Sequence, residues 1–134
     1  VGIVKGFRLQ KGAVATTIAH DSHNIICIGT NDEDMDTAIR ELEKIGGGIT
    51  IASNGETIAS LSLPVAGLMT TISAEELNAK YSQLLKALTS LGITDEFSPL
   101  LTLSFLALPV IPSLKLTNQG LFDVDTFTFV DVSV

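Results

Sequence analysis

An amphipathic segment from Asn31 to Gly46 constrains the fold of this chain more than any other feature. Asn31 can cap a helix N-terminus, and the three acidic residues after it suit the positive end of a helix dipole. Apolar side chains then recur at helical spacing up to the glycine. They are Met35, Ala38, Ile39, Leu42 and Ile45. Because a short helix is stabilised mainly by packing its apolar stripe, this one needs a sheet beside it.

A second helix is predicted between Ser73 and Gly92. Ser73 and Glu76 form a capping box, and Ile72 is placed to pack on Leu77 at the start of the helix. Gly92 follows the last apolar position and is typical of a helix stop.

The rest of the chain has the pattern of strands. Residues 49–53 and 56–61 flank Asn54-Gly55, a pair that tolerates positive φ and suits a two-residue hairpin turn. Further strand candidates are residues 12–18, 25–28, 101–107 and 126–132. We therefore predict an α+β fold with two helices packed on a mostly antiparallel β-sheet. The order strand, strand, helix in both halves also suggests a duplication.

Composition indicates a single domain and argues against two classes of partner. The 134 residues suit one hydrophobic core, so we expect one domain over residues 1–134. Eight basic and 15 acidic residues give a net charge of −7, which repels nucleic acid and anionic membranes. The longest apolar stretch, residues 99–112, is shorter than the ~20 residues that span a bilayer. We interpret Cys27, between isoleucines, as a small buried residue in a reducing cytoplasm.

The segment Ala19-His20-Asp21-Ser22-His23-Asn24 concentrates the polar chemistry. It contains both histidines and lies between two predicted buried strands, where polar groups must be satisfied or used. In extended backbone His20 and His23 would point to opposite faces, so they could share a ligand only across a turn at Asp21-Ser22. Two histidines and an aspartate can bind zinc, iron or manganese, but a closed site needs more ligands. A hydrogen-bonded turn is therefore favoured over a metal site.

Two other motifs are explained better by structure than by chemistry. Ser22 lies between Asp21 and His23, but adjacent residues rarely align as a catalytic triad, and no nucleophile-elbow glycines surround this serine. Gly46-Gly47-Gly48 could cradle a phosphate, yet it follows a helix instead of opening one. We interpret it as a helix stop.

Several segments, taken in order, point to a known family. They are Lys5-Gly6-Phe7, Ala19 to Asn24, Gly29 to Met35, Thr102 to Pro112, Leu116-Thr117, Gly120-Leu121 and Asp123 to Asp125. Together they resemble the C-terminal domain of bacterial adenine deaminase, a metal-dependent amidohydrolase, over nearly the whole chain. The resemblance implies one domain of an enzyme that hydrolyses adenine to hypoxanthine and ammonia in purine salvage.

The resemblance also implies that the catalytic metal lies elsewhere. The family's ligands, which include a His-x-His pair, belong to a preceding barrel that holds manganese or iron and generates hydroxide. This sequence contains no His-x-His, so no barrel ligand can be assigned to it. We expect that the catalytic barrel is absent from this chain and that the chain binds no cofactor.

Three roles remain open for the segment from His20 to Asn24, whose five residues are the candidate site. It could complete the barrel's active site, with a histidine that hydrogen-bonds the purine or transfers a proton. It could instead lock a turn and an interface in a scaffold or oligomerisation module. The chain could also be an independent small-molecule binding domain. We favour the first role over the second.

The opening Val1-Gly2-Ile3-Val4, which lacks an initiating methionine, favours a fragment cut at a domain boundary. We expect such a fragment to be inactive and the whole enzyme to be cytoplasmic, with the barrel of the same polypeptide as partner and adenine as substrate. With 46% hydrophobic residues, the fragment should expose an apolar patch and self-associate as a homo-oligomer. Our candidate patch is Leu63 to Met69, which is apolar without periodicity.

Overall fold

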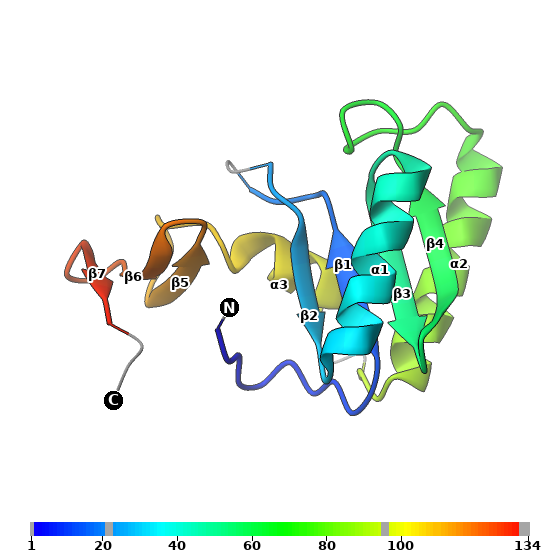
Figure 1. Ribbon diagram of the computed structural model, residues 1–134. Helices are drawn as coiled ribbons and strands as arrows, with labels where there is room; N and C mark the ends of the chain where they lie inside the picture. Colours follow the sequence, from blue (N-terminus) through cyan, green and yellow to red (C-terminus); the bar gives the residue numbers. More distant parts are fainter. Residues whose placement is uncertain (1, 21–22, 95–96, 132–134) are drawn as a thin grey trace.

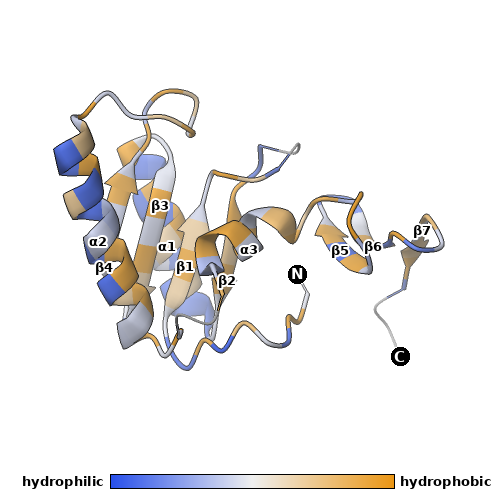
Figure 2. Ribbon diagram, turned by 180° about the vertical axis from the view of Figure 1, so that it is seen from behind, coloured by the Kyte–Doolittle hydropathy of each residue, from blue (hydrophilic) through white to orange (hydrophobic). Residues whose placement is uncertain are grey.

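The computed structural model describes residues 2–20, 23–94 and 97–131, and these form two antiparallel sheets and three helices. The main sheet has the order β2-β1-β3-β4. Its strands are β1 (Ala13–Thr16), β2 (Ile26–Gly29), β3 (Gly48–Ser53) and β4 (Glu56–Ser62). Helix α1 (Asp32–Ile45) covers one face, while α2 (Ala74–Ser90) and α3 (Pro99–Phe105) cover the other (Figures 1 and 2). None of the helices in the described ranges is long and apolar enough to span a membrane.

We predicted two helices packed on one sheet. The described residues form three helices and two sheets, so the prediction is wrong in the number of helices and in the number of sheets. Residues 101–107, expected as a strand, lie largely in α3. Pro99 suits the first turn of a helix, where its missing N–H is not needed, and Leu103 is fully buried in the core. The second sheet contains β5 (Leu114–Thr117), β6 (Gly120–Asp123) and β7 (Thr128–Val130), and it lies beside the main sheet (Figure 1).

The suggested duplication is also wrong. The chain does run β1-β2-α1 and then β3-β4-α2, and β1 pairs antiparallel with β3 at the centre of the sheet. Two copies of one unit joined in this way would be related by a twofold axis perpendicular to the sheet, which keeps both helices on the same face. Because α1 and α2 lie on opposite faces, the two halves are different units (Figures 1 and 2).

Alternation along β1 and β3 explains how the layers pack. Both strands are buried at every position because helices cover both faces of the sheet. Small residues face α1 and let it approach closely, and larger residues face α2 and α3. The α1 side contains Ala13, Ala15, Ala38, Leu42 and Ala52. The other side contains Val14, Ile49, Ile51, Leu84, Leu88 and Leu103.

The local signals at the element ends are confirmed. The side chains of Asn31 and Ser73 each accept a hydrogen bond from the backbone N–H three residues later, at 2.8 and 3.2 Å. Gly46 ends α1 in the left-handed region at φ 75°. Asn54 and Gly55 join β3 to β4 with φ of 56° and 73°, as a two-residue hairpin turn requires.

Candidate functional site

The histidine run lies in the connection from β1 to β2, at one end of the main sheet (Figure 1). Helix α1 and strand β4 end on the same side, so the turn before β3 and the long loop before α2 also lie there. We name this region the loop end and define it by residues 17–20, 23–25, 46–47 and 63–73.

Helix α3 holds His20 in place. The backbone N–H of His20 donates a hydrogen bond of 3.0 Å to the carbonyl oxygen of Ser104. Its imidazole stacks on the ring of Phe105, with centroids 4.6 Å apart and the planes 15° from parallel. The residue is nevertheless exposed. An ordered imidazole is therefore presented to the surroundings from the α3 side of the sheet.

His23 lies on the other side of the loop. It is exposed, and its φ of 49° is uncommon for a residue with a side chain. With Glu43 and Ala66 it lines an open depression of about 300 Å³ beside the end of α1. His20 therefore contacts α3, whereas His23 lines a depression beside the end of α1.

The remaining candidates are Asp21, Ser22 and Asn24. Asn24 is exposed, while Asp21 and Ser22 lie outside the described residues, so the roles suggested for them stay predictions. In the ranges that the structure describes, no three or more histidine, cysteine, aspartate or glutamate side chains group in a way that could hold a metal ion. The side chains in those ranges therefore do not fit a resident metal centre.

The three glycines after α1 form a helix stop, as predicted. The N–H groups of Gly46 and Gly47 donate to carbonyl oxygens of the last turn of α1, at 3.3 and 2.9 Å. The N–H of Gly48 donates to the Thr17 hydroxyl at 2.8 Å. All three donors are therefore engaged within the fold, and none points to a phosphate.

Thr17 connects the loops of this region, and sequence reasoning did not single it out. Besides accepting from Gly48, its Oγ1 donates to the carbonyl oxygen of Gly67 at 2.6 Å. Gly47 and Gly67 approach so closely that a Cβ on Gly47 would lie 2.8 Å from the Gly67 Cα. Gly48 and Gly67, the two hydrogen-bond partners, are 31 and 50 residues from Thr17 along the chain, and no local sequence pattern links them to it.

Comparison with known proteins identifies the family. Residues 1–128 match the family model described as adenine deaminase C-terminal domain. The chain belongs to this family. The adenine deaminase of Halalkalibacterium halodurans is 56% identical over 134 residues, which cover 100% of this chain and 23% of that protein. The adenine deaminase of Bacillus subtilis is 54% identical over 132 residues, which cover 98% of this chain and 23% of that protein.

The resemblance seen in the sequence is therefore confirmed, including its position as a C-terminal domain. This member of the adenine deaminase C-terminal domain family spans about a quarter of the length of the relatives it matches; the aligned share of a third relative, from Nitratidesulfovibrio vulgaris, is 24%. The loop end described above is thus one surface of a domain that, in those relatives, is part of a much longer chain.

Cys27 lies in β2 on the α1 side of this adenine deaminase C-terminal domain and is half-buried. Burial raises the pKa of its thiol from 9.0 to about 12. As the pH rises past 9.0, the Cys27 thiol loses its proton in the unfolded chain, while in the folded domain it stays protonated to a higher pH. The stability that the protonated thiol contributes is therefore complete below pH 9.0 and lost as the pH rises toward 12.

We expect the Cys27 thiol to be unreactive in the folded domain. At pH 8 the raised pKa lowers the thiolate fraction, which outweighs the higher nucleophilicity of a more basic thiolate. Disulfide exchange with an aromatic disulfide reagent should therefore be slower than in the denatured chain by at least about tenfold. Stopped-flow absorbance measures both rates, and Cys27→Ser provides the blank. Equal rates in native and denatured protein would contradict the buried, protonated state.

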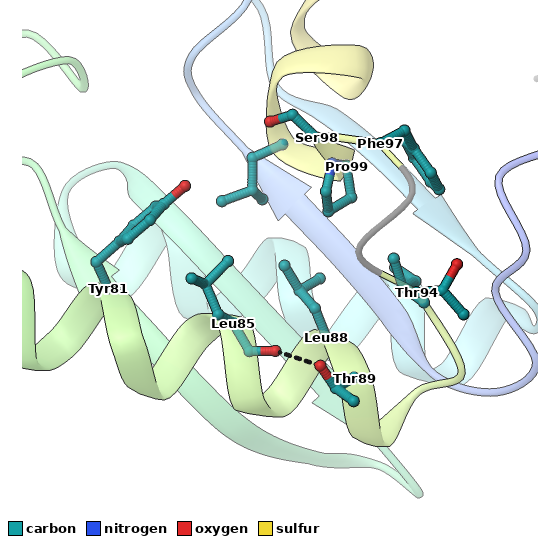
Figure 3. Close-up of a pocket in the computed structure, with 10 residues that line it drawn as sticks. Tyr81, Leu85, Leu88, Thr89, Thr94, Phe97, Ser98 and Pro99 are labelled. Carbon is teal, nitrogen blue, oxygen red and sulfur yellow. Dashed lines mark hydrogen bonds between the residues drawn. The ribbon is translucent and has the colours of Figure 1, made fainter.

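A hollow lies between α2 and the segment before α3. Tyr81 and Leu85 lie on one side and Phe97 and Pro99 on the other (Figure 3). The Thr89 hydroxyl, which also faces it, already donates to the carbonyl oxygen of Leu85 at 3.0 Å. At about 120 Å³ the hollow is smaller than typical ligand sites, and among the residues that the structure describes, none that lines it is charged.

Proposed function

We propose that this chain is the accessory C-terminal domain of an adenine deaminase, in which the rest of the polypeptide converts adenine and water to hypoxanthine and ammonia. The family assignment and the names of the relatives support this. Residues 1–134 form one domain in this proposal. The remaining polypeptide contains the catalytic domain. In this proposal that domain binds adenine and holds the manganese or iron ion that the family resemblance implies.

An active-site role for this domain rests on one observation, the exposed His20 imidazole, which is held by the Ser104 carbonyl and the Phe105 ring. We infer that the loop end faces the active site of the catalytic domain, where this histidine contacts the purine or exchanges a proton. Deamination leaves a nitrogen that must be protonated to depart as ammonia, and imidazole is the side chain best suited to proton exchange near neutral pH. Stacking orders the ring in advance, which reduces the entropy lost when it engages a substrate.

A structural role is the second candidate, and exposed apolar side chains favour it. Leu114, Phe127, Phe129 and Val130 are exposed on or beside the small sheet. In the patch predicted from the sequence, Val65, Leu68 and Met69 are exposed while Leu63 is buried. Such surfaces are typical of contacts with another domain or subunit. In this candidate the histidines stabilise the loop and the interface and take no part in chemistry.

Activity should require the whole polypeptide. We expect the 134-residue chain alone to release no ammonia from adenine with added manganese or iron, because its described side chains form no metal centre. The polypeptide lacking this domain should be slower than the full-length enzyme by on the order of a hundredfold if the loop supplies general acid or base help.

Ammonia release per folded molecule, measured for the three proteins side by side, tests this. Circular dichroism should show that each protein is folded before rates are compared. Turnover by the isolated chain close to that of the full-length enzyme would contradict the proposal. Full turnover by a folded polypeptide without this domain would leave only the structural role.

A further inference from the structure

We propose that Thr17, Gly47 and Gly67 form a clasp that positions the histidine loop against the loop between β4 and α2. Thr17 directly follows β1 and comes three residues before His20. The inference rests on the proposed function, since it explains how the loop end holds its histidines in the working enzyme. Thr17 is thus a positioning residue and takes no direct part in the reaction.

The Thr17 hydroxyl acts both as a hydrogen-bond donor and as an acceptor. It donates to the Gly67 carbonyl at 2.6 Å and accepts from the Gly48 N–H at 2.8 Å. The Thr17 backbone N–H donates in turn to the carbonyl oxygen of Gly48 at 3.0 Å. One side chain therefore joins the end of β1, the start of β3 and the loop after β4. A group that lacks a hydroxyl cannot replace these bonds.

Two glycines, which have no side chains, complete the clasp. Gly47 and Gly67 have φ of 100° and 72°. A Cβ on Gly47 would lie 2.8 Å from the Gly67 Cα, and a Cβ on Gly67 would lie 2.9 Å from the Thr17 Oγ1. Side chains at either position would push the two loops apart.

The loop that the clasp holds is a compact unit. The backbone of Val65 and that of Met69 exchange two hydrogen bonds of 3.1 Å, and the N–H of Leu68 donates to the Val65 carbonyl at 3.0 Å. Ala66 and Gly67, inside this turn, line the same depression as His23. Thr17 lines this depression too, so its bond to Gly67 joins two parts of the lining that His23 shares.

Replacing the threonine tests the hydroxyl. In the full-length enzyme, Thr17→Val keeps the branched shape and removes both hydrogen bonds, whereas Thr17→Ser keeps the hydroxyl. We expect Thr17→Val to lower kcat/KM by about tenfold to a hundredfold, because small displacements of positioned groups have effects of this size. The serine variant should stay within about threefold of the wild type. Equal kinetics for the valine variant and the wild type, together with equal deuterium exchange over residues 63–70, would overturn the clasp.

Two glycines test the close approach. Gly6, which lies outside the loop end, has a positive φ of 92°, near the 100° of Gly47, but a Cβ there meets no atom within 4 Å. Gly6→Ala therefore introduces a similar backbone strain without a collision and serves as the control for Gly47→Ala. We expect only Gly47→Ala to reduce kcat/KM as Thr17→Val does. An equal loss in both alanine variants would overturn the contact with Gly67.

Hydrogen–deuterium exchange separates failure of the clasp from failure of the proposed function. In the full-length enzyme, peptides over residues 63–70 should exchange faster in Thr17→Val than in Thr17→Ser, whatever the histidines do. If alanine at His20 or His23 lowers turnover while Thr17→Val changes neither exchange nor kinetics, the clasp is overturned and the proposed function stands. If neither histidine affects turnover but exchange rises, the clasp holds the loops, and the proposed role of the histidines is overturned.

Discussion

Replacing His20 or His23 by alanine in the full-length enzyme is expected to lower turnover by on the order of a hundredfold for the histidine that reaches the active site. The interaction removed is one that can strengthen in the transition state, so kcat should fall with kcat/KM. Folding should survive, since both side chains are exposed. Ammonia release per folded molecule and the thermal midpoint, measured for each variant, check this.

A purely structural role predicts the opposite pattern. Loss of the ring from His20 would then remove its stacking on Phe105 and loosen α3, with a loss of roughly 1–3 kcal/mol in the free energy of unfolding. Molecules that remain folded would keep their turnover. Because His20 contacts α3 and His23 lines the depression beside the end of α1, each variant is a control for the other. Unchanged turnover in both would remove the active-site role.

Leu84→Ala is expected to lower the free energy of unfolding by about 2–5 kcal/mol, since it empties a fully buried position in the larger core. Leu85, the next residue on α2, is 42% exposed, and Leu85→Ala should lower the same quantity by less than about 1 kcal/mol. Urea denaturation of the full-length enzyme, with a probe that reports on this domain, measures both.

The comparison is well matched because both substitutions remove the same atoms from the same helix. Helix propensity therefore changes equally, and the difference between the variants isolates burial. Similar losses at the two positions would contradict the packing of α2 on the main sheet.

Local signals predicted α1, α2 and the β3–β4 hairpin correctly. Caps at Asn31 and Ser73, the stop at Gly46 and the Asn54-Gly55 turn each act over a few residues. Their hydrogen bonds and backbone angles depend little on the rest of the fold, so a short window of sequence contains the information.

The segment from Pro99 to Phe105 could not be assigned in this way. A run of leucines alternating with threonine and serine fits a strand as well as a short buried helix. The proline at its start favours a helix, but burial of Leu103 and Ser104 against the rest of the fold decides the outcome. The second sheet, β5 to β7, was not predicted for a related reason. Which strands pair depends on contacts between separate segments, and a short window of sequence does not contain them.

The candidate site divides in the same way. The sequence by itself located the histidine run between two strands and, through family resemblance, placed it in an adenine deaminase C-terminal domain. Only the tertiary structure decided where the histidines lie and what holds them. Phe105, which orders His20, and Gly67, which anchors the loop near His23, come from distant parts of the chain. Contacts of this kind form when whole layers pack, and no local sequence pattern encodes them.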